Sequence, residues 1–223
     1  MIKKFLKILV LACFPIMTAN AEVISIGITG TAGMLDADGK ETFNGGTTTK
    51  SEDLFIGYAS GFVELHSPIG VRLGVSYVPY SLDSETAEQI HGSMPEDQGG
   101  TGETDTQRIK ASIEDLASLY LSYHMDMSGI AELFVKGGFM QGDLITKENL
   151  GTGSQYGNAT LEGTFYGAGI DKSLANGIFI RGEAVVTDFD DIKLTSTGSD
   201  NTNVIDISGL GGTNVSLSIG KTF

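Results

Sequence analysis

The chain has 223 residues, of which 40% are hydrophobic and 8% aromatic, and its 28 acidic residues outnumber 14 basic ones to give a net charge of −14. This length suits one domain, and so acidic a chain lacks the basic surface that phosphate binding requires, which argues against nucleic acid as a partner. The chain has a single cysteine, Cys13, so it cannot form an internal disulfide, and residues 22–223 offer no thiolate to a metal.

The N-terminal segment has the order of a secretory signal: lysines, then an apolar run, then small residues. These are Lys3, Lys4 and Lys7, the run 8–17, and Ala19-Asn20-Ala21. The run is about half of the roughly 20 residues that a membrane-spanning helix needs. We therefore expect a cleaved signal peptide over 1–21 and a mature domain over 22–223. Lipidation at Cys13 is the alternative, although Leu11 is bulky for a lipoprotein cleavage box.

After the signal, no stretch is apolar for the roughly 18 residues of a helical span. Apolar and polar residues alternate instead over segments of about ten residues, which is typical of strands in a transmembrane barrel. In 69–77, for example, alternate residues from Ile69 to Tyr77 are apolar, and Arg72 lies on the opposite face.

The alternation predicts an all-β fold, an eight-stranded antiparallel up-and-down transmembrane barrel. Eight is an even number, as single-chain bacterial barrels have. The predicted strands are 23–32, 53–65, 69–80, 109–125, 130–142, 159–171, 177–189 and 213–223. Glycine and aromatic residues occur on both faces of 54–65 and 159–171, so the sequence does not assign the inward face of these two strands.

The connections between the predicted strands alternate in length. Tight turns are expected at 66–68, 126–129 and 172–176, and long polar loops at 33–52, 81–108, 143–158 and 190–212. Barrels of this kind place short turns in the periplasm and long loops outside the cell. In the loop 81–108, seven acidic residues stand against Arg108 alone. This loop is either simply solvated or bridged by divalent cations to lipopolysaccharide.

Five charged residues are predicted to face the barrel interior: Arg72, Glu132, Lys136, Arg181 and Glu183. An eight-stranded barrel is just wide enough to be filled by side chains. Because buried charges need partners, we interpret this set as a structural network in a packed lumen. A narrow gated ion path is the alternative.

No residue pattern indicates a catalytic, cofactor or metal site. Of three histidines, only His91 lies in a predicted outer loop, where neighbouring serines and aspartates could serve as nucleophile and orienting acid. Loops are rich in such residues for solubility. We therefore predict a non-enzymatic protein without a cofactor.

The C-terminal segment resembles the assembly signal of outer-membrane barrels, which ends on an aromatic residue with apolar residues at alternate positions before it. Val215, Leu217, Ile219 and Phe223 match this pattern, whereas Lys221 departs from it. The resemblance implies recognition by the barrel-insertion machinery.

The layout of the whole mature chain, with 165–171 and 179–184 as its sixth and seventh strands, is similar to the opacity-type and OmpA-like eight-stranded barrels. This similarity implies a place in the bacterial outer membrane, in contact with its lipid and lipopolysaccharide, and a role in envelope structure or in surface interaction through four outer loops. A small gated porin is the alternative function, and an exported soluble β-barrel that binds an apolar ligand is a second one.

Overall fold

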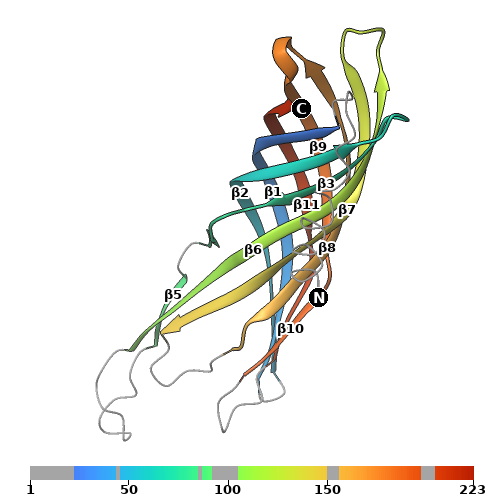
Figure 1. Ribbon diagram of the computed structural model, residues 1–223. Coiled ribbons are helices and arrows are strands. Elements are labelled where there is room, and N and C mark those ends of the chain that lie inside the picture. Colours follow the sequence, from blue (N-terminus) through green and yellow to red (C-terminus); the bar gives the residue numbers. More distant parts are fainter. Residues whose placement is uncertain (1–22, 44–45, 85–86, 92–104, 150–155, 197–203) are drawn as a thin grey trace, which may run out of the picture.

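The computed structural model describes residues 23–43, 46–84, 87–91, 105–149, 156–196 and 204–223. These residues form an antiparallel sheet that closes into a barrel (Figure 1). The predicted signal peptide, with Cys13, lies outside the described residues. Within the described part, no helix is long or apolar enough for a transmembrane segment.

Eight strands form the ring, and three short strands extend it. The ring consists of β1 (Ile24–Phe43), β2 (Gly46–His66), β3 (Val71–Tyr77), β6 (Asp105–Asp126), β7 (Glu132–Asn149), β8 (Ala159–Ser173), β9 (Ile178–Phe189) and β11 (Val204–Thr222). The extensions are β4 (Leu82–Asp83) and β5 (Ala87–His91), which pair with β6, and β10 (Ile192–Thr195), which pairs with β11. Pairing of β1 with β11 closes the ring, which confirms the predicted eight-stranded antiparallel barrel.

The strands run further than the sequence predicts. Residues 33–52 are expected as a long loop, but β1 and β2 stay paired through this region until Phe43 faces Gly46. Residues 143–149, 192–195 and 204–212, also expected in loops, are strand as well. These extensions lie beyond the apolar wall and need no apolar outer face, so the alternation used to find strands fades there.

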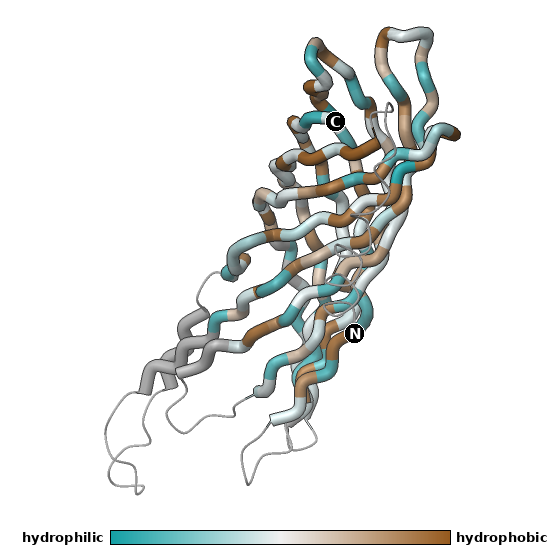
Figure 2. The backbone as a smooth tube through the Cα atoms, in the orientation of Figure 1, coloured by the Kyte–Doolittle hydropathy of each residue, from teal (hydrophilic) through white to brown (hydrophobic). Residues whose placement is uncertain are grey.

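The outer wall of the barrel is apolar. Figure 2 shows hydrophobic and hydrophilic residues alternating along the strands. Outward side chains are highly exposed, including Ile28 (64%), Leu121 (55%), Tyr166 (65%) and Leu217 (69%). On β1 the apolar outward face runs from Ile24 to Met34. With a rise of about 3.3 Å per residue and a tilt of about 40°, this span is about 25 Å tall, the height of the apolar band of such barrels.

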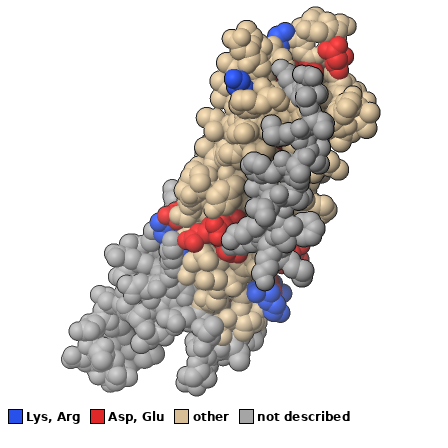
Figure 3. Space-filling model, in the orientation of Figure 1, with Lys and Arg blue, Asp and Glu red and all other residues tan. Residues whose placement is uncertain are grey.

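A collar of acidic residues bounds the apolar wall on the side of the long connections. Its members are outward-facing residues at or just past the end of the apolar face on six strands: Asp36, Asp53, Asp115, Asp143, Glu162 and Asp188. On the face drawn in Figure 3, acidic side chains gather in a band across the lower wall, and the wall above that band is nearly free of charge. Because ionised side chains are costly in hydrocarbon, the collar marks the border of the lipid-facing belt on the side of the long connections.

One seam of the wall is short. β2 pairs with β3 only from Gly61 to His66. Beyond Tyr77 the chain follows β6 instead, and in the described part of the chain no strand pairs with residues 46–60 on that side of β2. The hydroxyl of Tyr80 accepts a hydrogen bond from the Ala59 N–H across this gap. Such partners matter because unpaired backbone groups in lipid are costly.

Two substitutions on the outer face of β11 test the position of the belt. Replacing Leu217 with Arg places a charge near the middle of the belt and is expected to lower the free energy of unfolding by about 2–4 kcal/mol. Thr213→Arg lies on the same face close to the collar, and its expected cost is about 0–1 kcal/mol. Denaturant titration in lipid vesicles measures both, and equal costs would contradict this placement of the membrane.

Candidate functional site

The side chains inside the barrel form the candidate site. Inward positions alternate with the lipid-facing ones along every strand, so each of the eight ring strands contributes to one enclosed lumen. From the tight-turn end outward, the lumen contains a layer of ion pairs, a cavity lined by hydroxyl groups, and an apolar core.

Arg181 of β9 is the centre of the ion-pair layer. Its two terminal nitrogens donate to the two carboxylate oxygens of Glu64, at 2.6 and 2.8 Å, in a bidentate pair across the barrel. It also donates to Asp171 Oδ2, from Nε at 3.2 Å and from a terminal nitrogen at 2.9 Å. All three side chains are almost completely buried, with exposed fractions of 0–3%. The bidentate geometry is the strong form of an Arg–carboxylate contact.

Arg72 of β3 extends this layer across the lumen. It donates to Asp171 Oδ2 at 3.1 Å and to the carboxylate of Glu132. The Tyr120 hydroxyl donates to Glu64 Oε1 at 2.9 Å, and His66 lies within 4.0 Å of the same carboxylate. Three acidic and two basic side chains thus span the lumen, and each has a partner of opposite charge.

Aromatic rings hold the Arg181 guanidinium from the sides. Phe62, Phe134 and Phe179 place their ring centres 5.2–5.5 Å from it, within the range of cation–π attraction. All three rings fit because a neighbouring strand has a glycine at that place: a Cβ at Gly27 would lie 2.6 Å from Phe62 Cζ, one at Gly169 would lie 2.5 Å from Phe134 Cζ, and one at Gly220 would lie 2.5 Å from Phe179 Cζ. These inward glycines provide room for the rings.

A second ion pair lies one step further along the lumen. Lys136 Nζ donates to Glu183 Oε1 at 2.7 Å, and the ammonium group lies 4.8 Å from the Tyr120 ring centre and 5.6 Å from that of Phe165. The five lumen residues predicted from sequence therefore all face the interior. The structure brings them together in two groups, Arg72 with Glu132 and Lys136 with Glu183, while Arg181 pairs with other residues.

The two most important carboxylates, Glu64 and Asp171, are absent from the predicted set. They lie on the two strands whose inward face the sequence leaves open. Each strand has aromatic residues on both faces, so apolar content alone does not distinguish the lumen face from the lipid face. A signal was present in the sequence for Glu64: its neighbours Val63 and Leu65 are apolar, so on a lipid-facing strand they point outward and the charged residue between them has to point inward.

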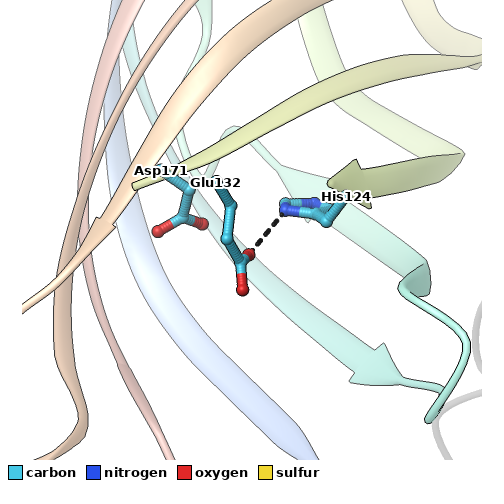
Figure 4. A group of neighbouring side chains, drawn as sticks. All are labelled: His124, Glu132 and Asp171. Atoms are coloured by element: carbon cyan, nitrogen blue, oxygen red, sulfur yellow. Dashed lines mark hydrogen bonds and ion pairs between the residues drawn. The ribbon is translucent and has the colours of Figure 1, made fainter. Parts of the chain in front are cut away.

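His124, Glu132 and Asp171 lie close enough to suggest a metal site, with one ligand atom of each within 4.8 Å of the others (Figure 4). His124 Nδ1 lies 3.1 Å from Glu132 Oε2, and its ring stacks on Phe134. However, both carboxylates already bind the guanidinium of Arg72. A metal ion among them would lie against this positive charge, so the group fits an ion-pair layer better than a metal centre.

The end of the lumen on the side of the long connections is closed by apolar side chains. Leu35, Leu161, Phe189, Ile192 and Leu194 form a buried cluster, and Ile56, Met140 and Tyr156 are among the residues that pack against it. Three of the five belong to β1, β8 and β9 at the level of the acidic collar, and two belong to β10 beyond it. The strand extensions outside the lipid-facing belt therefore have a hydrophobic core of their own.

The four residues of the C-terminal pattern, Val215, Leu217, Ile219 and Phe223, all point outward, with exposed fractions of 52–69%. Lys221, which departs from the pattern, places its ammonium group 5.0 Å from the Phe223 ring centre. The Val23 N–H donates to the Phe223 carbonyl at 2.9 Å, which joins the two ends of the ring. The segment is thus the closing strand, while its recognition by the insertion machinery stays a prediction.

The backbone of His91 lies at the end of β5. The serines and aspartates predicted near it are Ser81, Asp83, Ser84, Ser93 and Asp97. Asp83 accepts from Lys110 Nζ at 2.7 Å and the Ser84 hydroxyl accepts from the Ala111 N–H at 3.0 Å, while Ser93 and Asp97 fall outside the described residues. The alternative of loop chemistry at His91 therefore stays a prediction.

No protein-family model matches the chain, and no curated protein matches it. Among solved structures, it is similar to the outer membrane protein OprG from Pseudomonas aeruginosa, with a TM-score of 0.51 at 12% identity over 92% of this chain and 99% of that one. Two further similar structures are Ail, the attachment invasion locus protein of Yersinia pestis (0.42, 12%, 91% and 100%), and Neisserial surface protein A (0.40, 10%, 88% and 97%).

At such low identity these comparisons concern the fold alone. Closure of the ring, the apolar outer wall and the charged interior define the chain as a transmembrane β-barrel of the outer-membrane type. More particularly, it is a small eight-stranded barrel with a filled lumen.

Removing the central guanidinium tests the ion-pair layer. Arg181→Met leaves the buried Glu64 carboxylate without its bidentate partner, and breaking a buried pair in this way costs about 3–5 kcal/mol. The matched control is Lys193→Met, because Lys193 pairs with Asp206 at the surface, where a pair contributes about 0–1 kcal/mol. Urea unfolding in vesicles measures both variants, and similar midpoints would show that the layer contributes little to stability.

Proposed function

We propose that the protein is a non-enzymatic barrel of the bacterial outer membrane that serves envelope structure or surface interaction through its outer extension. The filled lumen carries this proposal. A layer of buried ion pairs and an apolar core block the interior at two levels, which favours a structural or surface role over transport.

The outer extension supports the surface part of the proposal. β1, β2, β10 and β11 continue past the acidic collar as paired strands over the apolar core. A paired and packed extension presents its connections to the outside at low conformational cost. The partners that we propose are outer-membrane lipid and lipopolysaccharide around the wall, and the barrel-insertion machinery during assembly.

A small gated channel is the second candidate, because seven charged side chains line the lumen and a cavity lies between the two blocking layers. An exported soluble barrel for an apolar ligand does not fit, since here the outer face is apolar and the interior charged, the reverse of what that function needs.

Electrical recording separates the structural role from the channel. The purified barrel in a planar lipid bilayer is expected to show no stable conductance, because ions would have to cross both the Arg181 layer and the apolar core. Arg181→Met, which removes the central cation but keeps the apolar core, is expected to remain closed as well. Regular single-channel steps from the unmodified protein would favour the channel instead.

Cysteine labelling tests the location and the orientation of the barrel. Cys13 is the only cysteine and lies in the predicted signal peptide, so introduced cysteines give a clear readout. Thr195→Cys on β10 is expected to react with a membrane-impermeant maleimide on intact cells. Ser173→Cys, exposed at the tight-turn end, is expected to react only after the outer membrane is permeabilised. The opposite pattern would reverse the orientation, and no labelling of either in intact cells would count against surface exposure.

A further inference from the structure

The free edge of β2 lies within the lipid-facing belt. In an antiparallel ladder, successive residues direct their N–H and C=O groups to opposite sides of the strand. The Ala59 N–H donates to Tyr80 across the seam, so the alternate residues Asp53, Phe55 and Gly57 direct their backbone groups the same way. Among the described residues, no strand pairs with these three on that side.

The local geometry of the chain keeps this seam open. Pro79 follows β3 closely and has no N–H with which to continue a ladder. On the opposite side, β6 has a bulge at Asp115, whose φ of 53° is left-handed. The Val78 N–H donates to the Leu116 carbonyl in this bulge. Because a bulge bends and twists its strand, the chain after β3 is led along β6 and away from β2.

The depth of the edge determines what it needs. Phe55 is one outward step below Asp53 of the collar, and Gly57 is two steps below. With a rise of about 3.3 Å per residue and a tilt of about 40°, they lie about 5 and 10 Å inside the belt. Backbone groups without partners are costly in hydrocarbon. Each residue offers a donor and an acceptor, so a matching partner brings both as well.

A second copy of the barrel does not match this edge. Two copies in one membrane are related by an axis along the membrane normal. Strands tilted by about 40° would then cross at about 80° where the two walls meet, which is too steep for a ladder. The edge is continuous with the lipid-facing wall, so its partner is a lipid.

A groove in the outer wall begins at this edge. Gly30, Ala32 and Gly57 line its floor, and the exposed side chains of Val215 and Leu217 stand along one side. A Cβ added at Gly30 would meet no atom within 4 Å, which shows how open the floor is. Since the groove lies within the lipid-facing belt, it can hold an acyl chain.

The collar defines the head of this lipid. Asp36 and Asp53 are register partners on β1 and β2, both exposed, at the collar end of the groove. A phosphate at this place would meet two negative charges beside a medium of low dielectric constant, where repulsion is strong. An uncharged head avoids this repulsion. An amide linkage at the top of the chain supplies the donor and the acceptor that the edge needs.

We propose that the free edge of β2 binds an uncharged lipid with an amide-linked acyl chain. The amide pairs with the backbone of Phe55, and the chain lies in the groove over Gly57. This site rests on the membrane placement in the proposed function, and it adds a particular lipid to the general lipid contact of the wall.

The test uses the full mature barrel in nanodiscs of phosphatidylcholine, to which three lipids are added in turn. A ceramide has an amide N–H and no charge, its N-methylated analogue lacks that N–H, and lipid A has amides together with phosphates. The backbone N–H resonance of Phe55 is followed by NMR. The reference is Thr164, which lies one outward step below Glu162 of the collar but pairs with a strand on both sides.

The ceramide is expected to give a saturable shift at Phe55 and none at Thr164. The N-methylated analogue is expected to bind about tenfold more weakly, as for a lost hydrogen bond. Lipid A is expected to give no saturable shift. Equal binding of the ceramide and its analogue would overturn the amide contact. A preference for lipid A would assign the edge to lipopolysaccharide and overturn the uncharged head.

Substitutions then locate the binding. Gly57→Leu fills the floor of the groove and is expected to weaken ceramide binding at least about tenfold, because a buried contact and a hydrogen bond are lost together. Gly182→Leu is the matched control: Gly182 is also an outward glycine with open space around it, but β9 is paired on both sides. If Gly57→Leu does not insert, Ala32→Leu replaces it.

Unchanged ceramide binding in the floor variant, or equal loss in Gly182→Leu, would refute this site. The binding is read in nanodiscs of defined composition, whereas the labelling on cells and the electrical recording read location and conductance. A failure of the lipid site is therefore distinguishable from a failure of the proposed function.

Discussion

Every backbone N–H and C=O of this chain that lies in hydrocarbon needs a partner within the protein, and that requirement determines the architecture. A sheet meets it only by closing on itself, so β1 has to pair with β11 along its length. Closure with eight strands leaves an interior that is too narrow for bulk water and wide enough for side chains. Once the barrel is closed, the sequence can vary mainly in which side chains fill this interior.

Inside the barrel, the charged side chains are paired and the space around them is filled by aromatic rings. Arg181 takes Glu64 and Asp171 as partners, and three phenylalanine rings enclose it. The rings in turn fit beside inward glycines on neighbouring strands. Removing a ring would open a void, and filling a glycine would displace a ring. The ion pairs, rings and glycines are consequently one packing unit, and its parts cannot be changed independently.

The sequence predicts the eight strands and their order because the lipid-facing side of each strand has to be apolar, which gives a period of two. It also predicts that Arg72, Lys136 and Glu183 face inward, since each stands opposite an apolar face. It does not predict Glu64 and Asp171, because on β2 and β8 inward rings make both faces look apolar. Nor does it predict the strand extensions, since outside the lipid neither face has to be apolar.

The acidic collar also determines which bilayer thickness matches the apolar wall of the barrel. The apolar face of β1 ends at Met34, and the next outward residue is the charged Asp36. On that side, β1 therefore has no further apolar surface to cover a thicker hydrocarbon layer. A band of about 25 Å suits a thin outer membrane, whereas an average bilayer has a hydrocarbon core of about 30 Å. In a thicker bilayer, either the lipid must thin around the protein or the collar must enter hydrocarbon, and each ångström of mismatch has a cost. An apolar wall of this height therefore matches the thin outer membrane better than a thicker bilayer.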